Sequence, residues 1–190
     1  MRNYILENGV NKIKLITDNG GPASGGLLLV LIRKIMRIET ILDKFDREER
    51  DRDIMWVLAG DVKFTGDVFK TEDAAQEVAQ NTSLSIKEES KIEYTVEADQ
   101  EHGGFKIVFR RIRNGQTRTT CIGKDIIKSA KFIEMRNLLG QISTQGKAPY
   151  KVETDDGVQT TLESMTSLVD YIMSVGKKGL SVQRYKGLGE

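Results

Sequence analysis

Residues 183–190, at the C-terminal end of the chain, combine positive charge with backbone freedom in the string Gln-Arg-Tyr-Lys-Gly-Leu-Gly-Glu. Arg184 and Lys186 supply cations that suit phosphate groups. Gly187 and Gly189 permit backbone conformations closed to other residues and let another molecule approach the main chain. These four residues are candidate contacts to the phosphate backbone of DNA. The same residues are also compatible with a strand that ends in a glycine turn.

A second candidate phosphate site comes from the uneven charge in the middle of the chain. Residues 71–101 hold nine acidic residues and two lysines, a net charge of −7, whereas residues 106–131 hold eight basic residues and one aspartate, a net charge of +7. In one interpretation, these charges face each other as cross-strand pairs worth a few tenths to about 1 kcal/mol each. In the other, the arginines of the basic segment form a face that binds duplex DNA. The arginines in question are Arg110, Arg111, Arg113 and Arg118.

Other polar constellations indicate structure rather than chemistry. The glycine-rich segment 20–26 lacks the Lys-Ser/Thr pair that closes a phosphate-binding P-loop. His102 lies in a Glu-His-Gly-Gly turn without a neighbouring nucleophile, and Asp155-Asp156-Gly157 is ordinary hairpin chemistry. Cys121, among Thr and Ile residues, is predicted to be a buried and inert thiol. We therefore expect no catalytic residue and no metal site.

The composition sets the broad class of protein. A chain of 190 residues can form one domain with a sizeable core, or one domain plus part of another. A net charge of +1 provides no overall attraction to nucleic acid. The longest apolar run, Leu27–Ile32, is far shorter than the roughly 20 residues of a membrane helix. One cysteine excludes an intrachain disulfide and suits the reducing cytoplasm, and a single histidine beside it argues against a zinc site.

The apolar residues recur with two periods, which predicts an α+β chain. Spacings of three and four predict helices over residues 27–45, 54–60, 74–84, 124–139 and 164–175. Alternation predicts strands over residues 11–17, 92–96, 105–109, 117–122, 149–152, 158–162 and 180–185.

Several residues predict where these elements begin and end. Asn114-Gly115 is a strong hairpin signal between two of the strands. Ser24 is a candidate cap for the first long helix, and Gly140 is a candidate C-terminal stop for the helix over 124–139. The mixed charges of residues 43–53 predict a solvated helix end followed by the start of a second helix.

The string Gln183–Glu190 resembles, residue for residue, a signature near the end of the Toprim domain in the B subunits of bacterial type II topoisomerases. The long charged helix over 27–45 and the Asn114-Gly115 hairpin followed by a helix are similar to the gyrase branch of that family. In this branch a large insertion splits the Toprim domain. The resemblance therefore implies a compact insertion domain over residues 20–176, with helices packed on a small antiparallel sheet.

The same resemblance implies Toprim edge segments at residues 1–19 and 177–190, the first of them starting with a strand at Tyr4-Ile5. Because the chain stops within the signature, we expect it to be a piece of a longer polypeptide. The alternative is a stand-alone interaction or adaptor domain whose terminal string is coincidental.

The resemblance also implies a parent enzyme that supercoils duplex DNA in the cytoplasm at the expense of ATP. In that family Mg²⁺ is held by a Toprim glutamate and an Asp-x-Asp pair, ATP by an N-terminal domain, and two A and two B subunits form a heterotetramer. The cleaving tyrosine belongs to the A subunit, so Tyr185 is not implied to be that residue.

The catalytic groups of the family have no counterpart here, because the chain contains no Glu-Gly-Asp-Ser stretch. Asp51-Arg52-Asp53 fits Asp-x-Asp literally but lies in a helical charge run rather than at a strand end. We therefore expect a catalytically silent piece that binds neither Mg²⁺ nor ATP and has a structural, coupling and DNA-positioning role.

Overall fold

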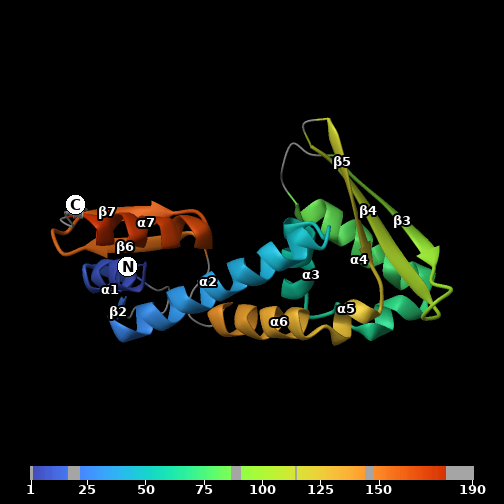
Figure 1. Ribbon diagram of the computed structural model, residues 1–190, viewed down its shortest axis with the longest axis horizontal. Coiled ribbons are helices and arrows are strands. Elements are labelled where there is room, and N and C mark those ends of the chain that lie inside the picture. Colours follow the sequence, from blue (N-terminus) through green and yellow to red (C-terminus); the bar gives the residue numbers. More distant parts are fainter. Residues whose placement is uncertain (1, 17–21, 87–90, 114, 144–147, 179–190) are drawn as a thin grey trace, which may run out of the picture. The chain divides into compact units, whose positions relative to one another are not determined.

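A computed structural model shows an α+β protein, as predicted, with two compact units (Figure 1). Unit 1 comprises residues 1–36 and 142–190, and unit 2 comprises residues 37–141. The structure describes residues 2–16, 22–86, 91–113, 115–143 and 148–178. The strand predicted over 180–185 lies outside these residues.

Unit 1 is built on a four-stranded antiparallel sheet with the strand order β2-β1-β6-β7. Its elements are α1 (Arg2–Asn11), β1 (Ile13–Ile16), β2 (Pro22–Ser24), the start of α2 (Gly26–Arg47), β6 (Tyr150–Thr154), β7 (Gln159–Leu162) and α7 (Met165–Lys177). Burial alternates along β1, and the register partners Leu15 and Val152 are both buried, so they share the inner face of the sheet. α1 and α7 pack against each other.

The N-terminal segment is helical, so the strand predicted at Tyr4-Ile5 is wrong. Leu6 and Val10 lie one helical turn apart and are each 1% exposed, whereas Tyr4 points to solvent. Burial at this spacing places one face of the segment against the core, which outweighs the β propensity of two adjacent residues. Ser24 does not cap α2 either, because it belongs to β2 and is followed by Gly25 with a φ of 56°.

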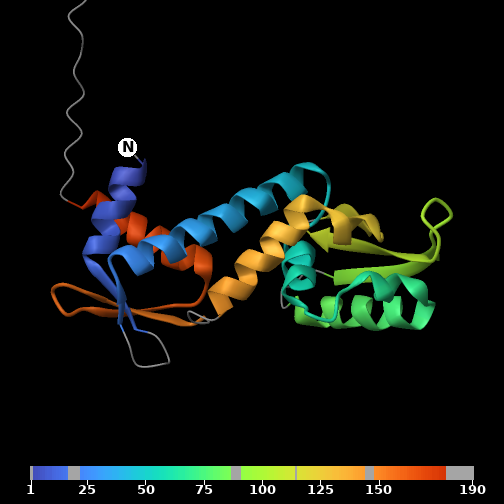
Figure 2. The same cartoon turned by 90° about the horizontal axis from the view of Figure 1, so that it is seen from below.

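Unit 2 combines helices with a three-stranded antiparallel sheet of order β3-β4-β5 (Figure 2). Its elements, besides the rest of α2, are α3 (Arg52–Gly60), the 3₁₀ helix η1 (Gly66–Lys70), α4 (Glu72–Ser85), β3 (Lys91–Ala98), β4 (Phe105–Arg113), β5 (Gln116–Ile122), α5 (Asp125–Lys128) and α6 (Ala130–Ser143). α4 packs against β3 and β4, and the predicted β4–β5 hairpin is confirmed. Phe64 meets Phe69 and Phe132 edge to face, with ring centroids 5.7 Å apart in both pairs.

The helix predicted over 124–139 is in fact two helices. α5 ends at Lys128, Ser129 is extended with a ψ of 124°, and α6 then runs to Ser143. Gly140 lies inside α6, so its prediction as a stop is wrong. A glycine permits the left-handed conformation that ends a helix but does not impose it.

Two glycines allow α1 and α7 to approach backbone to backbone. A Cβ atom on Gly176 would lie 2.0 Å from the carbonyl oxygen of Ile5, and one on Gly9 would lie 2.2 Å from the carbonyl oxygen of Ile172. Neither oxygen belongs to a flexible side chain, so the helices themselves would have to move. Gly176 is a buried packing residue within α7.

We predict that Gly176→Ala lowers the free energy of unfolding by about 1–3 kcal/mol, because the added methyl group overpacks the α1–α7 contact. Gly140→Ala is the matched control, since an added Cβ there meets nothing within 4 Å. In a helix interior this control should instead stabilise by roughly 0.5–1 kcal/mol. Thermal unfolding followed by circular dichroism compares the variants, and an unchanged midpoint for Gly176→Ala would contradict the close approach.

Candidate nucleic-acid interface

The candidate arginines lie on neighbouring strands but do not all face the same way. Arg111 of β4 and Arg118 of β5 are direct register partners. Arg110 is adjacent to Arg111 along β4, so it points to the opposite side of the sheet, where it is exposed. The side chain of Arg113 lies outside the described residues. The strand period therefore separates Arg110 from the Arg111–Arg118 pair.

Arg111 is only 4% exposed and is held by two carboxylates. Its Nη1 donates to both oxygens of Asp51, at 3.0 and 3.1 Å, and to Asp53 Oδ2 at 2.5 Å. Burial alone would lower the pKa of Arg111, but the hydrogen bonds and charges of Asp53 and Asp51 outweigh it and raise that pKa. This guanidinium is a permanently charged internal group.

Asp51 also caps the N-terminus of α3. Its Oδ1 accepts from the backbone N–H groups of Asp53, at 3.0 Å, and Ile54, at 3.2 Å. Asp51 is itself only 6% exposed. The expectation of a solvated charge run over 43–53 is therefore wrong at this residue. The pair Asp51 and Asp53, which fits Asp-x-Asp in sequence, binds a guanidinium here.

The rest of the 46–53 turn, which connects α2 and α3, is tied to β5 in the same way. Arg118 donates to Asp46 Oδ1 at 2.6 Å and to the Asp46 carbonyl at 2.5 Å. The Thr120 hydroxyl accepts from the Asp51 N–H at 2.9 Å and donates to the Glu49 carbonyl at 3.4 Å. Glu49 has a φ of 61°, an uncommon conformation for a residue with a side chain.

Two further ion pairs connect this turn to the helices that follow β5. Arg50 pairs with Asp125 at 3.2 Å, and Lys131 pairs with Glu48. Three cations of the basic segment 106–131, namely Arg111, Arg118 and Lys131, are thus neutralised by the 46–53 turn. The acidic segment 71–101 contributes the cross-strand pair of Glu97 with Lys106, at 3.5 Å, and its Glu93 lies opposite Arg110 in register.

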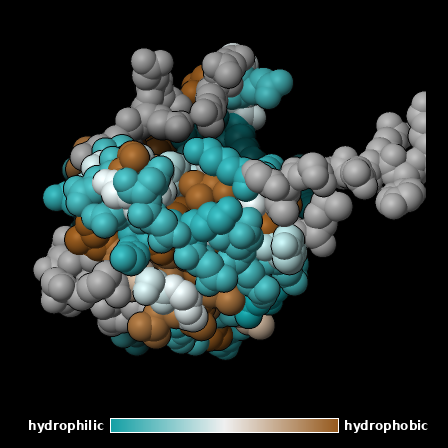
Figure 3. All heavy atoms as spheres, turned by 90° about the vertical axis from the view of Figure 1, so that its left-hand side faces the viewer, coloured by the Kyte–Doolittle hydropathy of each residue, from teal (hydrophilic) through white to brown (hydrophobic). Residues whose placement is uncertain are grey.

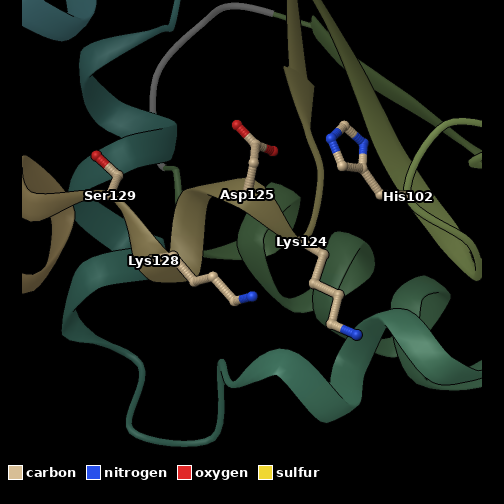
Figure 4. Close-up of a pocket in the computed structure, with 5 residues that line it drawn as sticks. All are labelled: His102, Lys124, Asp125, Lys128 and Ser129. Carbon is tan, nitrogen blue, oxygen red and sulfur yellow. The ribbon is translucent and has the colours of Figure 1, made fainter.

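Two lysines of the basic segment differ from the paired cations described above. Lys124 and Lys128 are exposed, and neither forms an ion pair within the part of the chain that the structure describes. Together with His102, Asp125 and Ser129 they line a hollow of about 380 Å³ (Figure 4). The sequence alone does not single out these two lysines, because nothing in the local pattern distinguishes them from Lys131.

The other residues singled out in the sequence are His102, Cys121 and the four residues of the terminal motif. His102 lies in an exposed turn, as predicted, with Nδ1 3.3 Å from Asp99 Oδ2. Cys121 is exposed, so its predicted burial is wrong: β5 turns it to the outer face, although partial desolvation raises the pKa of its thiol. The described residues contain no group of three or more His, Cys, Asp or Glu side chains placed to hold a metal ion. Arg184, Lys186, Gly187 and Gly189 lie outside the described residues.

The surface in Figure 3 carries apolar side chains interspersed with polar ones. Within the described ranges, no helix has both the length and the apolar character needed to cross a membrane.

Comparison with known proteins relates this chain to one family. Residues 14–145 match the family described as the DNA gyrase B subunit insert domain. The chain belongs to this family. The matched range includes the 46–53 turn, the three-stranded sheet and both lysines of the hollow, so these features lie within the gyrase B insert domain. The resemblance to gyrase B subunits inferred from the sequence is confirmed.

Gyrase B relatives also match outside that range. Over all of its length the chain is 25% identical to the DNA gyrase B subunit of Rickettsia typhi and 26% identical to that of Rickettsia prowazekii. A stretch covering 47% of the chain is 31% identical to the DNA gyrase B subunit of Caulobacter vibrioides, of which it covers 11%. The chain spans 23% of the length of the two Rickettsia proteins.

We predict that Arg111→Met destabilises unit 2 by about 3–5 kcal/mol, because it leaves the buried Asp51 carboxylate without its cation. Arg110→Gln on the same strand is the control, and a change at this exposed position should stay within about 0.5 kcal/mol. Urea unfolding measures both. Equal midpoints for the two variants would contradict the structural role of Arg111.

A second prediction concerns Asp99, in the turn that carries His102. Its Oδ1 accepts from the N–H groups of His102 and Glu101, both at 3.1 Å. The His102 bond is the main cause of a lowered Asp99 pKa, which burial opposes. A depressed carboxyl pKa stabilises the fold above the ordinary value, and that stabilisation disappears as the pH falls through the folded-state value.

Asp99→Asn should therefore lose less stability than the wild type when the pH is lowered from neutral to about 3. Urea midpoints at the two pH values provide the measurement, with Asp170→Asn at an exposed site as the control. If Asp99→Asn kept the full acid sensitivity of the wild type, the charged form of Asp99 would have no stabilising role.

Proposed function

We propose that this chain is part of the B subunit of a DNA gyrase, where it supports the enzyme and positions duplex DNA without performing chemistry. Membership of the insert-domain family and the gyrase B relatives along the whole chain support this parent. Residues 20–176 would form the insertion, and residues 1–19 and 177–190 would be Toprim segments. The ATP site, the Mg²⁺ carboxylates and the A subunit with its cleaving tyrosine would belong to other parts of the enzyme.

One observation carries the structural role: three basic side chains of unit 2 are bound by carboxylates of a single turn. Arg111, Arg118 and Lys131 are each held by carboxylates of the 46–53 turn. Unit 2 has 18 basic and 20 acidic residues, a net charge of −2. Such a unit does not attract DNA as a whole. Its internal ion pairs instead favour a stiff module that transmits force between the segments on either side of it.

Contact with DNA would then be local. Arg110, Lys124 and Lys128 are exposed, and cations of this kind can bind phosphates without reading sequence. The motif residues Arg184, Lys186, Gly187 and Gly189 would add contacts close to the cleaved DNA. We propose that these two groups of residues hold duplex DNA by its backbone and that Arg111 and Arg118 maintain the fold beneath.

Titration of the 190-residue chain with a short labelled duplex, between roughly 50 mM and 200 mM salt, tests DNA positioning. Binding should weaken steeply as salt rises, because each phosphate contact releases counterions. Arg110→Gln should reduce the salt slope by about 1, whereas Lys63→Gln, at an exposed lysine elsewhere in unit 2, should leave it unchanged. The double variant Arg184→Gln/Lys186→Gln measures how much of the DNA binding depends on the terminal motif. An absence of binding at the lowest salt would contradict DNA positioning.

A further inference from the structure

A hollow in unit 2 is lined by two lysines that the fold does not neutralise. It is formed by α5, the residues on either side of that helix and the β3–β4 turn, and its lining residues are His102, Lys124, Asp125, Lys128 and Ser129. We call it the lysine hollow. Figure 4 shows Lys124 and Lys128 extending to one side of α5, while the Asp125 carboxylate points to the other side.

The carboxylates around the lysine hollow already have cationic or N–H partners. Asp125 pairs with Arg50 at 3.2 Å, and Asp67, which feels the charge of Lys124, pairs with Lys70 at 2.7 Å. Asp99 accepts the two backbone N–H groups of its own turn and lies 3.3 Å from His102 Nδ1. Among the described residues, these pairings leave the ammonium groups of Lys124 and Lys128 without an ion pair of their own.

We propose that the lysine hollow binds a phosphate group, with the ammonium groups of Lys124 and Lys128 as its principal ligands. Two ammonium groups on one side provide the charge and the N–H donors that a phosphate oxygen needs. A volume of about 380 Å³ is at the small end of ligand pockets. It accommodates a phosphate group, either free or attached to a larger molecule.

The phosphate can come from the DNA backbone or from a small phosphorylated molecule. The DNA source rests on the function proposed above, and it would give the insert domain a defined contact point rather than a diffuse basic face. The phosphate site itself stands without that assumption. An experiment with two arms separates the two sources.

The first arm titrates the ¹⁵N-labelled 190-residue chain with inorganic phosphate and follows the amide signals of residues 102, 124, 128 and 129. We expect saturable shifts in the wild type and their loss in Lys124→Gln/Lys128→Gln. The control Lys44→Gln/Lys63→Gln removes the same charge from unit 2 at exposed lysines that do not line the hollow, and it should retain the shifts. Dispersed spectra of both double variants verify that they fold.

The second arm titrates the same three proteins with short duplex DNA over a range of salt. If the phosphate belongs to DNA, Lys124→Gln/Lys128→Gln lowers the salt slope by about 1–2, and the control does not. The hollow would instead be assigned to a small phosphorylated molecule if inorganic phosphate shifts the amide signals but DNA does not bind. The same assignment follows if DNA binds all three proteins equally. If shifts with phosphate are absent in the wild type, or are equal in both double variants, the site is overturned whether or not DNA binds.

Discussion

A guanidinium that is 4% exposed cannot be left unpaired, and this requirement organises unit 2. Arg111 brings its charge into the layer between the sheet and the helices, where Asp51 and Asp53 meet it. Since Asp51 also caps α3, the position of the strand and the starting point of the helix are coupled through one carboxylate. Loss of either partner would leave an unpaired charge, so the fold tolerates few arrangements of this turn.

The same constraint determines which cations remain at the surface. Arg118 lies directly opposite Arg111 in register, and two like charges at that distance would repel each other without the 46–53 turn. Asp46 neutralises the second arginine, and Glu48 neutralises Lys131 in α6. Within the described residues, three cations of this strongly basic segment are therefore bound to the 46–53 turn, whereas Arg110, Lys124 and Lys128 remain exposed.

Unit 1 depends on steric rather than electrostatic fit. Gly9 and Gly176 remove the side chains that would separate α1 from α7, so the first and last described helices pack at backbone distance. Asn8 Nδ2 donates to the Gly176 carbonyl at 2.8 Å beside that contact. Segments that are 168 residues apart in sequence are therefore parts of one core, while unit 2 is formed by the residues between them.

Local periodicity and motif identity were sufficient to predict most elements of the fold and the family. Helical spacing predicted α2, α3, α4 and α7, alternation predicted β1 and β3–β7, and the Asn114-Gly115 dipeptide predicted the β4–β5 hairpin. The terminal string pointed to gyrase B subunits. Two local signals were misleading: Tyr4-Ile5 is helical because Leu6 and Val10 are buried, and Gly140 lies within α6 because a glycine permits a helix to end without imposing it.

The pairing of the charged side chains, in contrast, depends on the folded arrangement of the chain. In one of the two interpretations of the sequence, the acidic segment 71–101 paired with the basic segment 106–131, but Arg111, Arg118 and Lys131 are bound by the 46–53 turn, about 60 residues before Arg111. Ion pairs are set by distances in space after the chain has folded, and their partners leave no periodic trace in sequence. For the same reason, Lys124 and Lys128 could be distinguished from their paired neighbours only once the hollow and the ion pairs around it were visible.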